Sequence, residues 1–225
     1  MNDRRSPDSS DERVAEADRP AAAADRALVL RLLARDEAAF VSLVRAHQES
    51  LVRLALSFVG NRATAEEVVQ ETWSQVLAGL AGFEGRSSLR TWIFRICTNR
   101  ALRRGERESR SMPLSALSSD DAPEVEPGRF DGAGHWTDPP RPWDARNPEE
   151  VLQRAQALEC IERAMQALPP AQRAVVLLRD VEGLEAAEAC SVLEVSESNQ
   201  RVLLHRGRAR IRRELEKLFS ESRRC

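Results

Sequence analysis

The C-terminal part of the chain combines two predicted helices with side chains that suit contact with DNA bases. A short helix over residues 184–193 is followed by a tight turn at 194–196, and Ser196 suits the N-cap of the longer helix that begins at Glu197. In a helix-turn-helix, the second helix enters the major groove and meets bases with its first residues. Amide and guanidinium groups there form bidentate contacts with adenine and guanine. The residues predicted to contact duplex DNA are Glu197, Ser198, Asn199, Arg201, Arg206 and Arg208.

Two residues depart from the usual helix-turn-helix pattern. The turn carries Glu194 where glycine is commoner, and Gly207 lies inside the second helix, where glycine costs about 1 kcal/mol relative to alanine. The alternative interpretation of this segment is an ordinary α-hairpin on the surface of a protein.

A second basic segment follows a loop that contains glycine. Residues 86–104 hold six arginines and no acidic residue. Single-stranded DNA is held by positive charge together with surfaces that accept unstacked bases. A loop with Arg86, Ser87 and Ser88 beside an arginine-rich helix suits that task, whereas the spacing of Trp92 favours packing into the core.

Charge is segregated along the chain, although the formal net charge is only −2. Residues 196–213 contain six arginines and one acid, whereas residues 105–150 contain eleven acids and five arginines. Two basic stretches separated by an acidic one predict two contacts with one anionic partner. For either stretch alone, a solvated helix face is an equally good interpretation.

The sequence contains no pattern typical of catalysis, metal binding or a bound cofactor. Cys97, Cys160, Cys190 and Cys225 lie far apart without a C-x-x-C pair, and the three histidines are equally scattered. We therefore expect no catalytic residue, no metal site, no cofactor and no enzymatic activity. No apolar run approaches 18 residues and the N-terminus lacks the apolar core of a signal peptide, which predicts a cytoplasmic protein without membrane insertion.

Helical periodicity runs from about residue 27 to residue 105. Apolar residues recur at steps of three and four, beginning with an amphipathic stripe over residues 40–58. Thr64 with Glu67 predicts a capping box at the start of the next helix. Ser87 or Ser88 is expected to cap the helix after it. A further helix is predicted to start at Pro148, and its inward stripe is expected to be Val151, Leu152, Ala155, Leu158, Ile161, Met165 and Leu168.

The pattern predicts an all-α protein with two small helical domains. No segment alternates as a half-buried strand does, and periodicity disappears where prolines and glycines gather before residue 148. In that stretch Phe130, Trp136 and Trp143 suit contact with a partner and packing on the chain itself equally well. The expected divisions are a disordered tail at 1–26, a helical domain at 27–105, an acidic, flexible Pro/Gly-rich linker at 106–147 and a second helical domain at 148–220.

The two helical segments resemble one protein family, the extracytoplasmic-function (ECF) sigma factors of bacterial RNA polymerase. Residues 36–44, 65–73 and 85–96 are similar to sigma region 2. Residues 168–177 and 181–184, with the helix-turn-helix that follows, are similar to sigma region 4. Together the resemblances cover residues of about 30–104 and 149–218 in the order of the family.

This resemblance implies a non-enzymatic subunit that binds core polymerase and recognises the −10 and −35 promoter elements. The implied partners are promoter DNA, the β′ clamp helices and β subunit of polymerase, and an anti-sigma factor. The helix over residues 197–208 corresponds to the one that binds the −35 element. The implied polymerase contacts are Glu66, Glu67, Gln70 and Glu71. The implied −10 contacts are Phe83, Arg86, Ser87, Ser88, Arg90, Arg95, Asn99 and Arg100.

Two positions differ from the family pattern, and two other functions compete with this one. Arg103 stands where an acid is common, and Gln200 stands where an apolar residue is usual, which allows a recognition helix shifted by one residue. One competing hypothesis is a stand-alone helix-turn-helix transcriptional regulator using residues 171–213, although it leaves residues 85–104 without a role. The other is an interaction protein whose two domains bind only protein.

Overall fold

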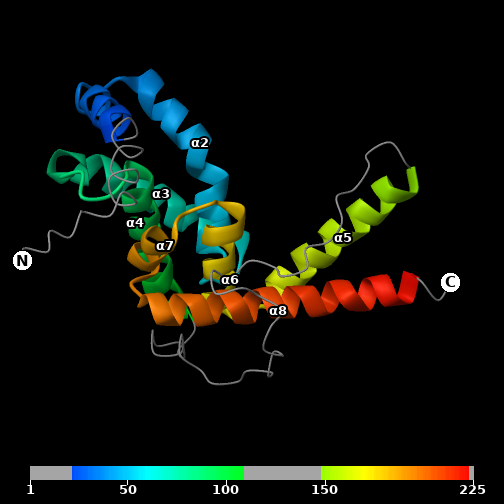
Figure 1. The fold of residues 1–225 in the computed structure, drawn as a ribbon. Helices are drawn as coiled ribbons and strands as arrows, with labels where there is room; N and C mark the ends of the chain where they lie inside the picture. Colours follow the sequence, from blue (N-terminus) through cyan, green and yellow to red (C-terminus); the bar gives the residue numbers. More distant parts are fainter. Residues whose placement is uncertain (1–21, 109–147, 223–225) are drawn as a thin grey trace, which may run out of the picture.

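The computed structural model describes residues 22–108 and 148–222, and within these ranges every regular element is a helix (Figure 1). The N-terminal unit contains a helix over residues 22–33, α2 (Glu37–Ala55), α3 (Arg62–Gly79), a 3₁₀ turn (Leu80–Gly82) and α4 (Leu89–Glu108). The C-terminal unit contains α5 (Pro148–Ala167), α6 (Pro170–Val176), a π-helical turn (Leu177–Val181), α7 (Ala186–Leu193) and α8 (Glu197–Ser222). The predicted all-α class is confirmed.

Several boundaries differ from the expected ones. Residues 22–26, expected in the N-terminal tail, are helical, and α4 continues through Arg103 to Glu108. The stretch predicted as a linker, with Phe130, Trp136 and Trp143, lies outside the described residues.

Short polar side chains start the first helices of the N-terminal unit. Asp36 caps α2 by accepting a hydrogen bond from the Ala39 amide at 3.0 Å. Asn61 caps α3 through the Thr64 amide at 2.9 Å. The predicted capping box between Thr64 and Glu67 is therefore wrong. Asn61 is extended, so its amide oxygen reaches the first turn and the helix begins at Arg62.

Helices α2, α3 and α4 pack around a largely apolar core. Leu51, Val69 and Phe94, one from each helix, are completely buried. Trp73 of α3 packs edge-to-face on Phe40 and donates its indole N–H to Gln48 at 2.7 Å, so its one polar atom is satisfied. This packing fixes which face of α4 points outward.

In the C-terminal unit, α8 packs along α5 and α6 (Figure 1). Ala157, Cys160 and Ala164 are the buried positions of α5, and Leu168 is buried just beyond its end. Of the predicted stripe, Leu168 is confirmed and Ile161 and Met165 are half-buried, whereas Ala155 is exposed and Leu158 is 53% exposed. The prediction was therefore wrong for Ala155 and Leu158. The side chains of Val151 and Leu152 lie outside the described residues.

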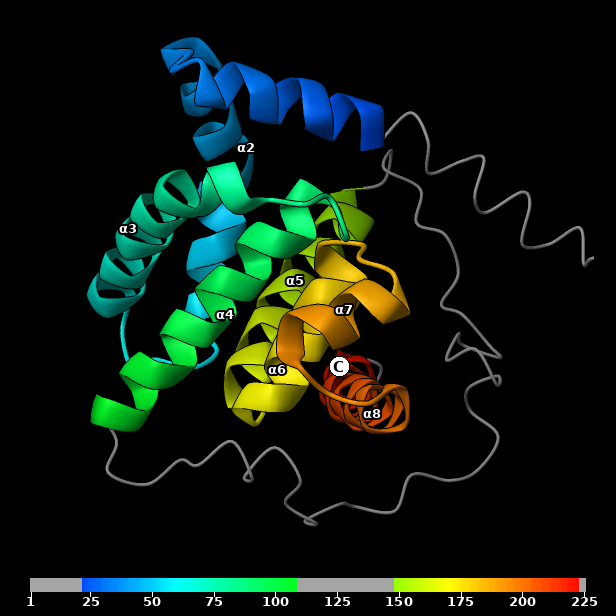
Figure 2. The ribbon, with the colours of Figure 1, turned by 90° about the vertical axis from the view of Figure 1, so that its left-hand side faces the viewer.

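The two units touch along α4 and α7, which lie side by side in Figure 2. Buried apolar side chains of both units belong to one continuous core. Arg173 of α6 adds a polar tie by donating to the Leu56 carbonyl at 3.2 Å. The C-terminal unit therefore covers part of the surface of α4.

Gly207 marks the close approach of α8 to α6. A Cβ atom added there would lie 2.6 Å from Val176 Cγ2 and 3.5 Å from the Gln172 carbonyl oxygen. Gly207 lowers the intrinsic helix propensity of α8, but its missing side chain lets α8 pack against α6.

We expect Gly207→Ala to lower the free energy of unfolding by about 1 kcal/mol, measured by urea denaturation. Overpacking of this kind costs about 1–3 kcal/mol, and the gain of about 1 kcal/mol in helix propensity offsets only part of a mid-range cost. Gly60→Ala, outside the helices, is the control for an added Cβ that would meet no atom within 4 Å. A Gly207→Ala protein as stable as the control protein would contradict the packing described.

Candidate nucleic-acid interface

Helix α7, its turn and α8 form a helix-turn-helix. The Glu194 backbone has φ 54°, so this residue ends α7 in the left-handed conformation that glycine usually supplies. The Ser196 hydroxyl accepts from the Asn199 amide at 3.3 Å, as predicted for the N-cap of α8. The chain therefore enters the second helix at a defined angle.

The first turns of α8 present most of the predicted base contacts to solvent. Glu197, Ser198 and Arg201 are exposed and Asn199 is half-buried. Gln200 is only 4% exposed and lies on the inner side of the helix.

Arg208 is engaged within the chain, whereas Arg206 is half-buried on the same helix. The Arg208 guanidinium meets both carboxylate oxygens of Asp180, at 2.9 and 2.5 Å. This bidentate pair ties α8 to the π-helical turn, so a phosphate at Arg208 would have to displace Asp180.

The loop before α4 borders a cavity of about 380 Å³. Gly85 adopts φ +71°, which only glycine tolerates easily, and turns the loop toward α4. The rings of Phe83 and Trp92 lie 5.2 Å apart, so Trp92 packs as predicted while it also lines the cavity. The other lining residues are Gly82, Glu84, Arg86, Ser87, Arg95 and, from α7, Ser191.

Two exposed arginines make this cavity basic. Arg86 pairs with Glu84 at 2.9 Å but remains 85% exposed, and Arg95 is exposed in the second turn of α4. Ser88 caps α4 by accepting from the Thr91 amide at 3.1 Å, while Asp25 accepts from the Leu89 amide at 2.7 Å. The structure thus gathers the loop residues and the first turns of α4 around one hollow.

Further along α4, residues predicted to contact DNA form ion pairs with residues of α3 predicted to contact polymerase. Arg100 pairs with Glu71 of α3 at 2.5 Å and bonds Gln75 at 2.7 Å. Arg104 pairs with Glu67 at 2.7 Å. Arg100 therefore lies with the acidic face of α3 and away from the loop cavity.

The polymerase candidates share the outer side of α3. Glu67, Gln70 and Glu71 are exposed, and Glu66 pairs with Arg62 at 2.8 Å. Exposed ion pairs of this kind contribute little to the free energy of unfolding. These carboxylates can therefore leave their intramolecular arginine partners for another protein at a small free-energy cost.

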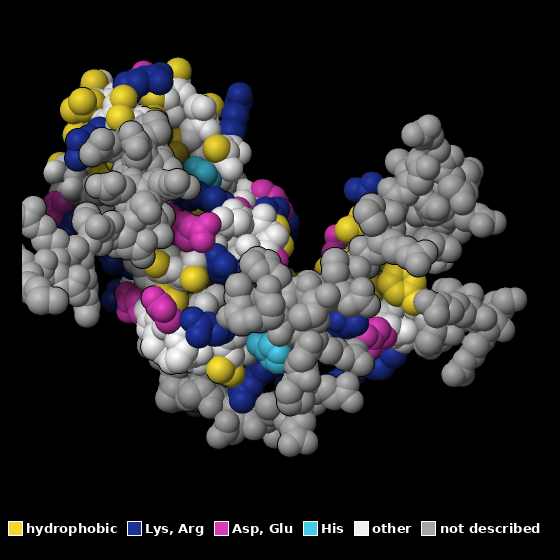
Figure 3. Space-filling model, viewed as in Figure 1, with side chains coloured by type: hydrophobic (Ala, Val, Ile, Leu, Met, Phe, Trp, Pro, Cys, Tyr) yellow, Lys and Arg dark blue, Asp and Glu magenta, His cyan; other side chains and the backbone are white. Residues whose placement is uncertain are grey.

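Next to this face lies an apolar hollow of about 630 Å³. Leu33, Val41 and Leu77 line it and are each 44–48% exposed. Figure 3 shows hydrophobic side chains gathered, with charged side chains among them, at the end of the molecule where the helix over residues 22–33 and the start of α2 lie in Figure 1. Exposed apolar patches of this kind mark sites of protein–protein contact.

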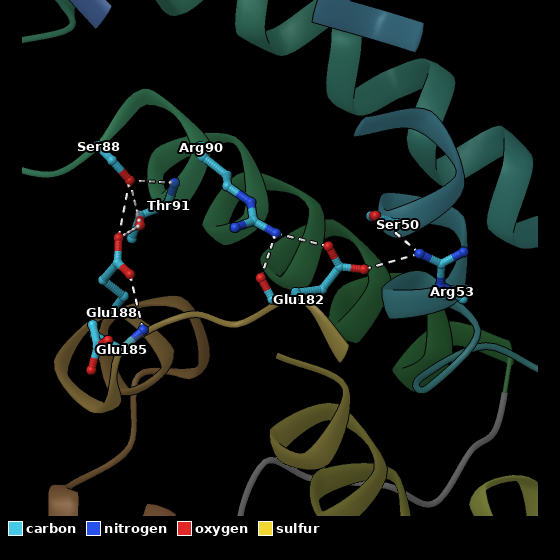
Figure 4. Close-up of polar contacts among 8 residues, drawn as sticks. All are labelled: Ser50, Arg53, Ser88, Arg90, Thr91, Glu182, Glu185 and Glu188. Atoms are coloured by element: carbon cyan, nitrogen blue, oxygen red, sulfur yellow. Dashed lines mark hydrogen bonds and ion pairs between the residues drawn. The ribbon is translucent and has the colours of Figure 1, made fainter. Parts of the chain in front are cut away.

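Arg53, Thr91, Glu182 and Glu188, none of them predicted from the sequence, join the two units together with Ser88 and Arg90 (Figure 4). Glu182 accepts from Arg53 at 3.0 Å and from Arg90 at 2.8 Å. Glu188 accepts from Ser88 at 3.1 Å and from Thr91 at 2.7 Å. These partners are about a hundred positions apart in the chain, so no local pattern could have revealed them.

The charge of Glu182 is maintained despite burial. Burial by itself raises the pKa of this carboxyl, but hydrogen bonds from Ser50 and Arg53 and the charges of Arg53 and Arg90 leave the pKa below its usual value. His47 lies nearby, and burial and the charge of Arg90 lower its pKa.

Cys97 belongs to the core, as predicted. It is completely buried, and burial raises the pKa of its thiol to about 12 although a hydrogen bond with Thr72 lowers it in part. Within residues 22–108 and 148–222 no cluster of three His, Cys, Asp or Glu side chains could hold a metal ion. Over the same ranges no helix has the length and apolar character needed to span a bilayer.

Two family models match the chain: Sigma-70 region 2 over residues 43–111 and Sigma-70, region 4 over residues 158–211. RNA polymerase sigma-H factor of Pseudomonas aeruginosa is 28% identical over 198 residues, which cover 88% of this chain and 97% of that protein. The chain belongs to the ECF sigma factor family.

Other relatives agree with this assignment. ECF RNA polymerase sigma factor SigE of Mycolicibacterium smegmatis is 32% identical over 190 residues, which cover 83% of this ECF sigma factor and 66% of SigE. The structure of CnrH in complex with the cytosolic domain of CnrY has the same fold. Its TM-score is 0.52 at 22% identity, and the match covers 86% of this chain and 98% of that one.

We expect the Cys97 thiol to be unreactive toward Ellman's reagent at mildly alkaline pH until the protein is unfolded in urea. The reactive species is the thiolate, and burial suppresses both ionisation and access. The variant to test carries alanine at Cys160, Cys190 and Cys225. A variant that retains only the half-buried Cys190 is the control and should react in the folded state. If Cys97 in the folded protein reacted with Ellman's reagent as fast as a reactive Cys190 in the control, the inner face of α4 would be accessible to solvent.

Proposed function

We propose that this ECF sigma factor directs RNA polymerase to promoters by gripping the core enzyme and two promoter elements, without chemistry of its own. One observation carries the proposal. A single chain offers a helix-turn-helix whose second helix begins with exposed polar and charged side chains and, on separate elements, an arginine-bordered hollow at the start of α4. Family membership assigns these two parts to regions 4 and 2.

The proposed −35 contacts are those at the start of α8. Ser198, Asn199 and Arg201 read base edges, and Glu197 lies beside them. Arg206 binds phosphate, and Arg208 does so after leaving Asp180. Side chains in the first turns of a recognition helix supply this kind of discrimination.

The proposed −10 contacts surround the hollow between Phe83 and Trp92. Its volume suits a small planar group, and Arg86, Ser87 and Arg95 at its border supply positive charge and hydrogen-bond donors. Ser88, Arg90 and Asn99 continue this surface along α4. Arg100 is the last proposed −10 contact along α4, and its ion pair with Glu71 links this surface to the proposed polymerase contacts on α3.

The proposed polymerase contacts are Glu66, Glu67, Gln70 and Glu71 on α3. The apolar hollow lined by Leu33, Val41 and Leu77 supports a protein partner on the same side. We propose that the β′ clamp helices bind here and that the β subunit contacts the C-terminal unit.

We further propose regulation by an anti-sigma factor in the cytoplasm. CnrH, whose fold is the same, was solved with the cytosolic domain of CnrY. A stand-alone helix-turn-helix regulator would leave the α3 and α4 surfaces without a role. A module that binds only protein would leave the solvent-facing Arg201 without a role.

Run-off transcription with core polymerase that lacks any sigma factor tests the proposal. Templates come from start sites mapped by sequencing transcript ends after overexpression of the chain. We expect initiation only when the chain is added. A chain that binds these templates but confers no initiation on the core would instead be a stand-alone regulator.

Arg201→Ala should lower −35-dependent initiation by roughly five- to 150-fold, the equivalent of one bidentate base contact at about 1–3 kcal/mol. Arg163→Ala on α5 removes an exposed arginine outside the proposed DNA contacts and should have no such effect on −35 recognition. Arg206→Ala should reduce the salt dependence of promoter binding by about one phosphate contact. Equal activity of the Arg201→Ala and Arg163→Ala chains would support the protein-only interaction module.

A further inference from the structure

The outer side of α8 carries an apolar residue among polar and charged ones. Val202 is 45% exposed in the second turn of this helix, next to the exposed Arg201. The proposed −35 contacts all act through hydrogen bonds or charge, so they leave Val202 without a role.

Packing on the inner side of α8 fixes the direction of the Val202 side chain. Gln200, Leu203 and Leu204 are 4–6% exposed, and Gly207 packs against α6. With 3.6 residues per turn, the mean direction of these four residues is roughly 150° from that of Val202. A rotation of the helix that buried Val202 would therefore expose them. The core formed by the described residues accordingly includes Leu203 and Leu204 but not Val202.

The neighbours of Val202 place it in the part of the helix that suits entry into the major groove. Ser198 lies one turn earlier on the same side and is exposed. Its hydroxyl is 3.1 Å from that of Ser196, which caps the helix through the Asn199 amide. In a helix-turn-helix these first turns meet the base edges, so Val202 lies among the base-contacting positions.

The stability of the helix does not explain a valine at this exposed position. Alanine, arginine, lysine and glutamine all have higher helix propensities than valine. A β-branched side chain in a helix does, however, keep one preferred rotamer. The two methyl groups of Val202 are thus held in place and lose little conformational entropy when they make a contact. The apolar group that the major groove of DNA offers for such a contact is the C5-methyl of thymine.

We propose that Val202 contacts the C5-methyl group of a thymine in the −35 element and so determines the preference for thymine at that position. The inference rests on the proposed function, since it specifies what α8 recognises there. Asn199 and Arg201 form hydrogen bonds with other base edges, whereas Val202 discriminates by apolar contact alone. Cytosine carries a hydrogen atom at C5 and therefore loses this contact.

Replacement of thymine by deoxyuridine tests the proposal, because deoxyuridine lacks only the methyl group and keeps the same base pairing. The complex of the full-length chain with core polymerase is titrated with the mapped promoter. Each thymine of the −35 element, on either strand, is replaced singly by deoxyuridine. We expect one replacement to weaken binding by the wild-type chain roughly fourfold, the equivalent of one buried methyl group at about 0.8 kcal/mol.

Variants of Val202 assign this effect to the valine. The Val202→Ser chain should bind the thymine and deoxyuridine promoters equally, and the Val202→Ile chain should keep the preference. Serine and valine have similar helix propensities, so the serine variant does not weaken the helix. The control is Leu30→Ser, which removes a 68% exposed apolar side chain of the N-terminal unit and should keep the preference. A preference that persists in Val202→Ser would overturn the proposal.

A methylated cytosine at the same position separates the methyl group from the rest of thymine. Promoters with cytosine or 5-methylcytosine there, each paired with guanine, are compared. Methylation should strengthen binding by the wild-type chain, again roughly fourfold, and should have no effect on Val202→Ser. Methylation that leaves wild-type binding unchanged would overturn a contact with the methyl group.

Initiation from the unmodified promoter is measured with the same complexes. If the wild-type chain initiates transcription but distinguishes thymine from deoxyuridine nowhere in the −35 element, the methyl contact is overturned and the proposed function stands. If the wild-type chain does not initiate, the proposed function itself is overturned.

Discussion

Burial of the inner face of α4 is the constraint on which the rest of the structure depends. Ile93, Phe94, Cys97 and Ala101 are completely buried, which pins the helix against α2 and α3. With that face fixed, Arg95 borders the loop hollow, Arg100 and Arg104 face the acidic side of α3, and Arg90 faces the C-terminal unit. The functional surfaces are consequences of how one apolar stripe is packed.

The arginines on the outer face of α4 form ion pairs within the chain but could also bind the phosphates of a nucleic acid. Arg90 meets Glu182 across the two units and also lies over the Phe94 ring at 5.3 Å. Arg100 and Arg104 pair with the acids of α3. Pairs that are partly exposed are exchanged at little cost. A helix of this kind can be held in a compact chain and still offer its charges to a nucleic acid.

Much of this arrangement could be predicted from local patterns. The caps at Ser88 and Ser196 and the helix-turn-helix were confirmed because each depends on a few neighbouring residues. The start of α3 was wrong because Asn61 competed successfully with Thr64 for the same role. The α5 prediction was wrong for Ala155 and Leu158, because periodicity alone does not say which of two adjacent apolar rows, the one through Ala157 or the one through Leu158, faces inward.

Long-range partners were beyond such patterns. Glu182 looks like an ordinary surface acid in the sequence, and only the fold brings it onto Arg53 and Arg90. The same holds for Gly207, whose cost to the helix is explained by Val176 on another helix. The sequence therefore predicted which residues of α4 and α8 are candidates for contact with a partner, but not which residues of other helices pack against them in the folded chain.

The most direct test of the central claim is photo-crosslinking from the outer face of α4. A benzoylphenylalanine in place of the exposed Arg95 would be activated in a complex of the chain, core polymerase and a mapped promoter. The account predicts a crosslink to the non-template strand within the melted −10 element. Crosslinks confined to protein or to duplex DNA would contradict it.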